Sequence, residues 1–188
     1  MEKNRRLFSI GGDHSITYPL VKAYSQFYKD FHILHFDAHS DLYDEYEGDK
    51  YSHACPFARI MEDKLTLRLM QIGIRTLNIH QRQQAEKYNV EILEMKDFNI
   101  NELPKLTKPV YISLDMDAID PAFAPGISHH EPGGLSSRQL IDVLHTIDVP
   151  VIGADLVEYN PNRDVSDITV ALAAKLMKEI ISKMIVNG

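Results

Sequence analysis

Residues 31–41 read FHILHFDAHSD, and this stretch carries the main clue to the fold. Its first six residues form a short, mostly apolar run of the kind found in a strand, and its last five form a polar turn. In an α/β protein with a parallel sheet, ligands bind outside the carboxyl ends of the strands. The stretch therefore predicts a buried strand that ends in side chains with a functional role.

The alternation of apolar runs with amphipathic stretches continues along the whole chain. Strands are expected at Leu7–Ile10, Phe31–Phe36, Leu67–Ile74, Val90–Leu93, Val110–Leu114 and Val149–Leu156. Helices are expected near residues 15–29, 53–63, 79–88, 136–147 and 166–185. Strands separated by helices predict a three-layer αβα fold with a mainly parallel sheet. No repeat or linker interrupts the pattern, so residues 1–188 are expected to form a single domain.

The composition is that of an ordinary soluble globular protein, with 44% hydrophobic and 25% charged residues. The net charge of −7 argues against a nucleic acid or an anionic membrane as a partner, because either would require a basic face. The first ten residues, MEKNRRLFSI, lack the apolar core of a signal peptide, and no apolar run approaches the ~20 residues of a membrane span. A single cysteine, Cys55, favours a reducing, cytoplasmic location.

Acidic and imidazole side chains gather at the ends of four predicted strands. They lie in the segments GGDHS (11–15), DAHSD (37–41), SLDMD (113–117) and GADLVE (153–158). Residues two apart in an extended chain project to the same side, so the second and third segments can each point several side chains into one crevice. Crowded carboxylates repel one another by on the order of several kcal/mol unless cations neutralise them.

A simpler explanation exists for each aspartate alone, because strand-end aspartates commonly cap helices or start turns. That explanation fits poorly when Asp37, His39 and Asp41 alternate after one strand and Asp115 and Asp117 alternate after another. Oxygen-rich ligation with few imidazoles and no thiolate favours manganese over structural zinc. Two such ions about 3.5–4 Å apart form a site that activates water, so the sequence predicts a hydrolase with two Mn²⁺.

The blocks GGDHS, DAHSD, SLDMDAIDP and GADLVEYNP, in this order, resemble the signature blocks of the arginase, agmatinase and formiminoglutamase (ureohydrolase) family. KYSHACPFARIMED (50–63) and DPAFAPGISHHEPGGLSSRQLIDVLH (120–145) are most similar to plant-type arginases. The resemblance covers essentially the whole chain. It implies an arginase-like fold and the hydrolysis of a guanidinium compound to urea and an amine.

The resemblance also implies a set of metal ligands. One manganese would be held by His14, Asp37, Asp41 and Asp115, and the other by Asp37, His39, Asp115 and Asp117. Asp37 and Asp115 would bridge the two ions. Asp120, in the same block as Asp115, is expected to be structural.

Hydrolysis of a guanidinium needs an activated water and a carboxylate that holds the planar cation in line with it. The resemblance gives this carboxylate role to Glu158, for which a solvated loop glutamate is the alternative. His53 resembles the family's proton-shuttling histidine, although a lone loop histidine is usually only polar surface. His129 and His130 are expected near the pocket entrance. Ordinary strand or helix residues are expected at His32, His35, His80 and His145.

The choice of substrate rests on finer features. L-arginine carries an α-carboxylate that agmatine lacks, so an arginase needs donors at the rim of its pocket. Ser40, Tyr43 and Ser52 are the expected contacts for this end of the substrate. The acidic segment 44–49 would instead suit the cationic tail of agmatine. The similarity of residues 51–62 to plant-type arginases favours L-arginine, which would be hydrolysed to L-ornithine and urea. Agmatinase or another guanidino-acid hydrolase is the alternative.

Only ten residues precede GGDHS, so the resemblance implies a chain that lacks the N-terminal third of the family domain. It further implies a homo-oligomer, either a trimer or a hexamer. Two rival readings stay open. One is a metal-dependent deacetylase with an Asp/His/Asp zinc site, and the other is an inactive ureohydrolase-like subunit that binds metal without turnover.

Overall fold

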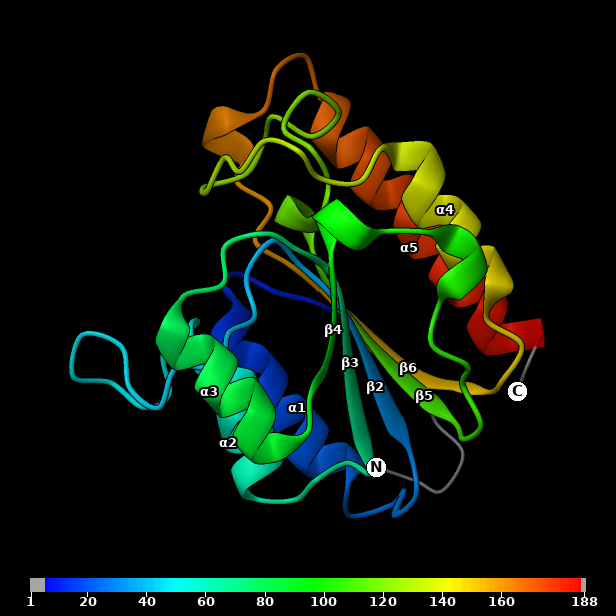
Figure 1. Cartoon of the computed structure of the whole chain (residues 1–188). Coiled ribbons are helices and arrows are strands. Elements are labelled where there is room, and N and C mark those ends of the chain that lie inside the picture. Colours follow the sequence, from blue (N-terminus) through cyan, green and yellow to red (C-terminus); the bar gives the residue numbers. More distant parts are fainter. Residues whose placement is uncertain (1–5, 187–188) are drawn as a thin grey trace.

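Six strands pair side by side into one sheet in the computed structural model, which describes residues 6–186 (Figure 1). The strands are β1 (Phe8–Ile10), β2 (His32–Phe36), β3 (Arg68–Ile74), β4 (Glu91–Glu94), β5 (Val110–Asp115) and β6 (Val151–Val157). Their order is β1-β6-β5-β2-β3-β4, and all five neighbouring pairs are parallel. The predicted parallel sheet is confirmed. Half of the stretch inspected for a signal peptide, residues 1–5, lies outside the described residues.

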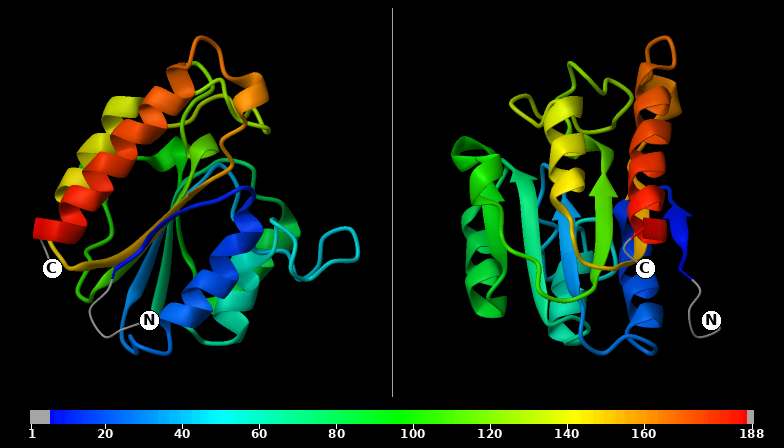
Figure 2. Two further views of the ribbon diagram at one scale, coloured as in Figure 1. Left: turned by 180° about the vertical axis from the view of Figure 1, so that it is seen from behind. Right: turned by 90° about the vertical axis from the view of Figure 1, so that its right-hand side faces the viewer.

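Helices cover both faces of this sheet, which confirms the three-layer prediction (Figure 2). They are α1 (Thr17–Tyr24), α2 (Pro56–Glu62), α3 (Ile79–Tyr88), α4 (Ser137–Thr146) and α5 (Ile168–Val186). Helices α1, α2 and α3 lie on one face, and α4 and α5 lie on the other. The first predicted helix, 15–29, is too long, because a 3₁₀ turn precedes α1 and the helix ends at Tyr24. Within residues 6–186, no helix is both long and apolar enough to cross a lipid bilayer.

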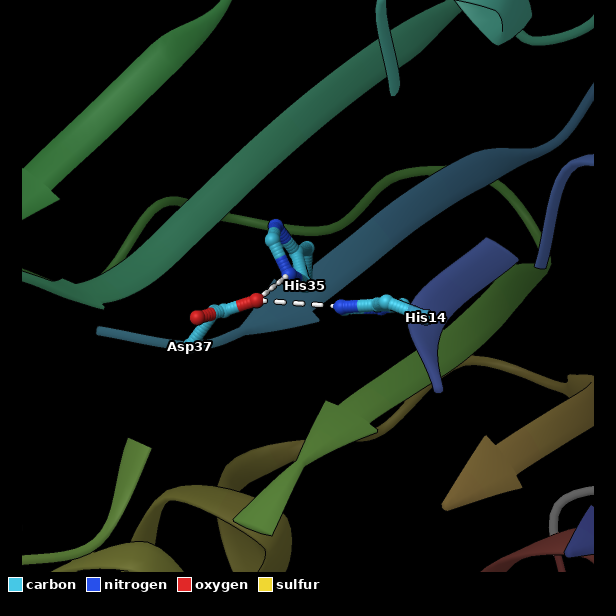
Figure 3. A group of neighbouring side chains, drawn as sticks. All are labelled: His14, His35 and Asp37. Carbon is cyan, nitrogen blue, oxygen red and sulfur yellow. Dashed lines mark hydrogen bonds and ion pairs between the residues drawn. The ribbon is translucent and has the colours of Figure 1, made fainter. Parts of the chain in front are cut away.

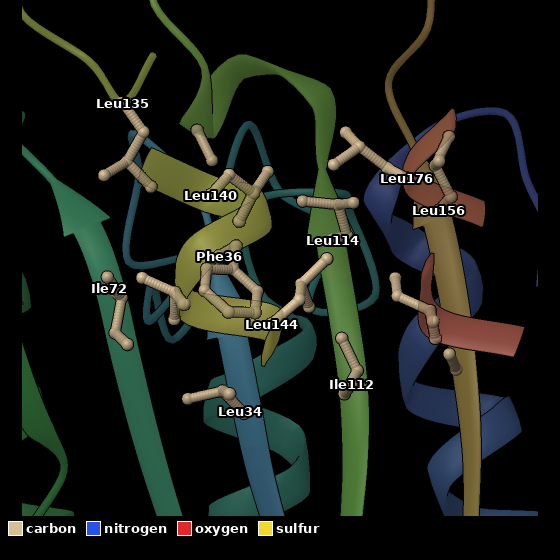
Figure 4. Close-up of a cluster of buried hydrophobic side chains, with 14 of the residues drawn as sticks. Leu34, Phe36, Ile72, Ile112, Leu114, Leu135, Leu140, Leu144, Leu156 and Leu176 are labelled. Carbon is tan, nitrogen blue, oxygen red and sulfur yellow. The ribbon is translucent and has the colours of Figure 1, made fainter. Parts of the chain in front are cut away.

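Two apolar cores hold the layers together. The larger one lies between the sheet and helices α4 and α5, where Phe36, Leu114 and Leu144 are fully buried (Figure 4). The smaller one lies under α1, α2 and α3 and includes Tyr24 and Phe57. Every residue of the central strands β2, β5 and β6 is buried, because both of their faces are covered. This explains why these strands are largely apolar runs rather than alternating ones.

Local sequence chemistry sets the start of two helices. The Ser136 hydroxyl accepts a hydrogen bond from the Gln139 N–H, and the Gln139 side chain accepts one from the Ser136 N–H. Asn78 and Gln81 form the same reciprocal capping box at the start of α3. Each box satisfies amide groups that a helix would otherwise leave unpaired. The helices therefore begin at defined residues, and the loops before them have fixed ends.

The strand order brings the loops that follow β2, β5 and β6 to one edge of the sheet. Phe36 on β2 pairs with Leu114 on β5, and Leu114 pairs in turn with Leu156 on β6. The residues that follow these three therefore leave the sheet at one level. As a result, segments 37–52, 115–135 and 157–165 meet at the carboxyl ends of neighbouring strands.

At Gly73, strand β3 lies very close to the backbone of Asp37. The φ of Gly73 is +104°, and a Cβ placed there would lie 2.8 Å from the Asp37 carbonyl oxygen. The register between β3 and β4 also shifts between Ile72 and Ile74. A glycine inside a strand commonly marks such an irregularity or a close backbone approach.

We expect Gly73→Ala to lower the free energy of unfolding by more than the roughly 1–3 kcal/mol typical of backbone strain alone, because Asp37 must also move. Gly48→Ala is the matched control, since Gly48 has a φ of +84° but no atom within 4 Å of the added Cβ. Urea denaturation of both variants measures the difference. Equal losses would show that the contact with Asp37 is unimportant.

Candidate metal centre

The six predicted metal ligands converge at the carboxyl edge of the sheet. His14 lies in the 3₁₀ turn before α1. Asp37, His39 and Asp41 follow β2, whereas Asp115 ends β5 and Asp117 lies in the next turn. Four of the six are almost fully buried acids, with at most 6% of their surface exposed. Side chains from three loops thus share one small volume.

The first group of ligand atoms surrounds the ring nitrogen of His14. His14 Nδ1 lies 3.1 Å from Asp37 Oδ2, 3.0 Å from Asp41 Oδ2 and 3.3 Å from Asp115 Oδ2. Adjacent ligands of a small divalent ion, each about 2.1 Å from it, are about 3 Å apart. Among the described residues this buried nitrogen has no hydrogen-bond partner of normal geometry. These four donors therefore fit around one divalent ion.

The second group lies on the other side of Asp37. His39 Nδ1 is 3.4 Å from Asp37 Oδ1 and 3.0 Å from Asp117 Oδ2, and one ligand atom from each residue falls within a 4.8 Å cluster. Asp37 thus gives one oxygen to each group, as a bridging carboxylate does. The second oxygen of Asp115 accepts a hydrogen bond from the Asp117 N–H at 2.8 Å. Bridging by Asp115 therefore stays a prediction.

Turns, rather than an extended chain, bring the alternating residues together. Asp37 Oδ1 accepts a hydrogen bond from the N–H of His39, two residues later, at 2.6 Å. Asp115 makes the same contact with Asp117, and Asp41 has a φ of +49°. The expectation that these side chains align along a strand was wrong in this respect, because each aspartate folds the chain back into an Asx turn.

Burial and crowding shift the pKa values of the ligands in the metal-free protein. Desolvation raises the pKa of Asp115 well above its usual range and that of Asp41 to about 6. Burial lowers the pKa of His14, but the nearby carboxylates of Asp115, Asp37 and Asp41 outweigh it and raise the pKa well above 6.5. Burial likewise lowers the pKa of His39, but the carboxylates of Asp117 and Asp37 outweigh this effect and raise the pKa to about 12. In the metal-free protein, bound protons therefore offset the negative charge of the carboxylates, and divalent cations can take their place.

A hydrogen-bond chain through the Ser113 hydroxyl links the other ring nitrogen of His14 to Asp155. His14 Nε2 lies 3.0 Å from Ser113 Oγ, and this hydroxyl donates to Asp155 Oδ1 at 2.7 Å. Asp155 also accepts from the hydroxyls of Tyr111 and Thr17. The aspartate of the fourth sequence block is thus a support for His14 and not a member of the two ligand groups.

His35 is a residue that the sequence reasoning missed. It was expected to be an ordinary strand residue, yet its Nε2 lies 2.8 Å from Asp37 Oδ2 (Figure 3). Desolvation outweighs the hydrogen bond with Asp37 and lowers the pKa of His35 to about 4. A polar residue two positions before the DAHSD block, inside an otherwise apolar run, was the available signal.

A cavity of about 290 Å³ is lined by four of the predicted metal ligands, His39, Asp41, Asp115 and Asp117. Its wall includes three of the predicted catalytic and substrate-binding residues, namely Tyr43, His53 and Glu158. The other two do not reach it within the described part of the chain. The fully buried Ser40 and the Ser52 hydroxyl, which accepts from the Ala54 N–H, are absent from its lining.

Backbone hydrogen bonds hold Glu158 in the wall of this cavity. Glu158 directly follows β6 and has a φ of +64°, and its N–H donates to the Gly12 carbonyl at 2.8 Å. Its Oε1 accepts from the His14 N–H at 3.0 Å. Burial raises the pKa of this carboxyl group. Glu158 is therefore fixed beside the metal ligands and is not a freely solvated loop residue.

Aromatic rings also line the cavity. His53 lies parallel to His129 at 6.2 Å and edge-on to Tyr46 at 5.7 Å. None of the described residues that line the cavity is lysine or arginine. His130, which was also expected near the pocket entrance, is not among the described lining residues; it is exposed and contacts the Pro125 carbonyl oxygen. Carboxylates and aromatic faces, with no lysine or arginine among these lining residues, make a cavity suited to a cation.

Known proteins of one family resemble this chain in sequence. The profile described as "Arginase family" matches residues 1–182. The protein named "Arginase 1, mitochondrial" of Arabidopsis thaliana is 48% identical over 97% of this chain and 56% of its own length. The N(1)-aminopropylagmatine ureohydrolase of Thermus thermophilus is 42% identical over 82% of this chain and 55% of its own length. This chain thus spans about half the length of these curated relatives.

A solved structure agrees with the sequence comparison. The arginase from Medicago truncatula superimposes with a TM-score of 0.91 at 49% identity. The match covers 97% of this chain and 60% of that chain. The arginase-like fold expected from the sequence blocks is confirmed.

We expect titration with Mn²⁺ to give two binding events per chain, because the ligand atoms form two groups. Asp37→Asn should weaken both events, since Asp37 gives an oxygen to each group, whereas Asp117→Asn should weaken mainly one. Asp13→Asn is the control, because Asp13 is exposed and lies outside both groups. Isothermal titration calorimetry measures the affinities. Equal effects of Asp37→Asn and Asp117→Asn would contradict the bridging role.

Proposed function

Because the chain belongs to the arginase (ureohydrolase) family, we propose that it is a hydrolase of C–N bonds in linear amidines, converting L-arginine to L-ornithine and urea. One observation carries this proposal. Two groups of metal-ligand atoms lie beside a carboxylate, Glu158, in a cavity that no lysine or arginine of residues 6–186 lines. Such a cavity can hold a guanidinium cation next to an activated water.

The ligand set favours two Mn²⁺ as the cofactors. The donors are carboxylate oxygens and two imidazole nitrogens, a combination that suits a hard or borderline divalent ion better than structural zinc. His14, Asp37, Asp41 and Asp115 would hold one ion, and Asp37, His39, Asp115 and Asp117 the other. When bound, the two cations supply Lewis acidity that activates water for hydrolysis.

Glu158 is proposed to orient the guanidinium group. Its Oε1 is occupied by the His14 N–H, which leaves the second oxygen able to accept from the substrate. The left-handed backbone of Glu158 and the hydrogen bond from its N–H to Gly12 hold the carboxylate in place without a cationic partner. A planar guanidinium bound to a fixed carboxylate has few orientations left, which favours attack from the metal side.

His53 is proposed to deliver the proton that the leaving amine needs. Its imidazole lies in the cavity wall and contacts the rings of Tyr46 and His129. These ring contacts limit its rotation. Imidazole is the side chain that most often transfers protons near neutral pH.

Hydrogen-bond donors in the cavity wall would discriminate between substrates. Tyr43 lies in this wall, and the Tyr43 hydroxyl already accepts a hydrogen bond from Asn78, so its own proton can be donated to an α-carboxylate. Gln81 adds a second donor there. The carboxylates of the wall, including Glu131, favour agmatine instead, so agmatine hydrolysis is the second candidate.

We expect Glu158→Gln to lower kcat/KM for the guanidinium substrate strongly and to leave the Mn²⁺ content unchanged, because only the orienting charge is removed. His53→Asn should lower kcat by ~10²–10⁴-fold with a smaller change in KM. Glu131→Gln is the comparison for loss of charge alone, since Glu131 also lines the cavity but belongs to neither ligand group. Urea release with added Mn²⁺ measures all three. Near-normal rates for either of the first two variants would refute that residue's role.

The substrate assignment has its own test. We expect a higher kcat/KM for L-arginine than for agmatine, because a site that hydrogen-bonds a substrate group rejects an analogue lacking it. Tyr43→Phe should reduce that preference and leave agmatine hydrolysis nearly unchanged. The reverse order of the two substrates in the unmodified chain would make the protein an agmatinase. Absence of urea from both, despite bound Mn²⁺, would favour a subunit without turnover.

A further inference from the structure

We propose that His35 is a positioning residue rather than a metal ligand, and that together with Gln71 it fixes the carboxylate of Asp37 between the two ligand groups. This inference rests on the metal centre of the proposed function. The alternative is real, because ligand atoms of His14, His35 and Asp37 lie within 4.8 Å of one another and could form a three-ligand site.

His35 reaches Asp37 from inside the sheet. It is fully buried on β2, and its Nε2 lies 2.8 Å from Asp37 Oδ2. Figure 3 shows His35 and His14 converging on the same carboxylate oxygen from different directions. The His35 ring also stacks on Phe57, with 3.8 Å between ring centroids. The imidazole is therefore held in one orientation by packing before any ion binds.

Gln71 determines which nitrogen of His35 carries the proton. Gln71 Nε2 donates to the Ser40 carbonyl oxygen at 2.7 Å and lies 3.0 Å from His35 Nδ1. A carbonyl oxygen can only accept, so this contact identifies the amide nitrogen and its orientation. The same amide group then donates to His35 Nδ1. The His35 proton must consequently lie on Nε2, where it is donated to Asp37.

A protonated Nε2 has no lone pair for a metal ion, so His35 serves as a hydrogen-bond donor to a ligand. Asp37 Oδ2 faces the first ligand group and Oδ1 faces the second. A donor fixed on Oδ2 limits rotation of the carboxylate and keeps one oxygen aimed at each ion. Loss of such an outer hydrogen bond typically lowers metal affinity by about 10–100-fold.

The sheet register makes this relay possible. His35 and Gln71 are paired residues on the neighbouring strands β2 and β3. Directly paired residues project to the same face of a sheet, so their side chains meet under the turn that carries Asp37. A shift of one residue would turn either side chain to the opposite face.

The first experiment compares Mn²⁺ binding by variants of the full chain. His35→Leu removes the donor and should weaken binding by about 10–100-fold. His35→Gln keeps an N–H near the position of Nε2 and should bind nearly as well as the unmodified chain. Gln71→Met should weaken binding as well, and the double variant His35→Leu/Gln71→Met should lose no more than His35→Leu alone, because the two residues act in series. Additive losses would overturn the relay.

The second experiment reads the tautomer directly. Long-range ¹H–¹⁵N NMR correlations of the metal-free chain should show His35 with its proton on Nε2, and the His35→Gln spectrum identifies its signals. A proton on Nδ1 would overturn the proposal even if a variant fails to fold. Binding is measured without turnover, so the two proposals fail separately. An unmodified chain that binds no Mn²⁺ refutes the proposed function, whereas unchanged affinity in His35→Leu refutes only the role of His35.

Discussion

The concentration of buried carboxylates at one edge of the sheet is the constraint on which the other features depend. Asp37, Asp41, Asp115 and Asp117 are each at least 94% buried, and their oxygens lie within a few ångströms of two imidazoles. Desolvated like charges of this kind are stable only with compensating positive charge. Protonated histidines can supply that charge in the metal-free protein, and divalent cations can supply it with a geometry that also serves hydrolysis.

The sheet provides the rigid frame that holds these groups close together. The central strands are buried on both faces, and the apolar cores on either side leave their ends little freedom to separate. The parallel pairing of β2 with β5 brings Asp37 and Asp115 out of the sheet at neighbouring positions. Gly73 lets β3 approach the backbone of Asp37 without a side chain between them. Packing energy from the apolar layers thus offsets the repulsion at the edge.

Two of the three histidines of FHILHFDAHSD, His35 and His39, show how position within one segment assigns different chemistry to one residue type. His39 lies in the turn, a quarter of its side chain is exposed, and its Nδ1 faces two carboxylates. His35 lies in the strand, where Phe57 and Gln71 fix its ring. An imidazole whose nitrogen faces only carboxylates can bind an ion, whereas one whose two nitrogens already bond to Gln71 and Asp37 orients a neighbour instead. On the cavity side, His53 and Glu158 are the residues proposed to act on a bound guanidinium cation.

The sequence by itself determined the strands, most of the helices and the parallel sheet, because these follow from local periodicity and from residue types at strand ends. The candidate ligands came from the resemblance of its four blocks to the arginase family. Only the tertiary structure decided which side chains meet. It placed an oxygen of Asp37 in each ligand group, kept Ser40 and Ser52 away from the cavity, and joined His35 to Gln71. Strand order and turn geometry bring together residues tens of positions apart. Such contacts depend on the whole fold, and no local pattern in the sequence encodes them.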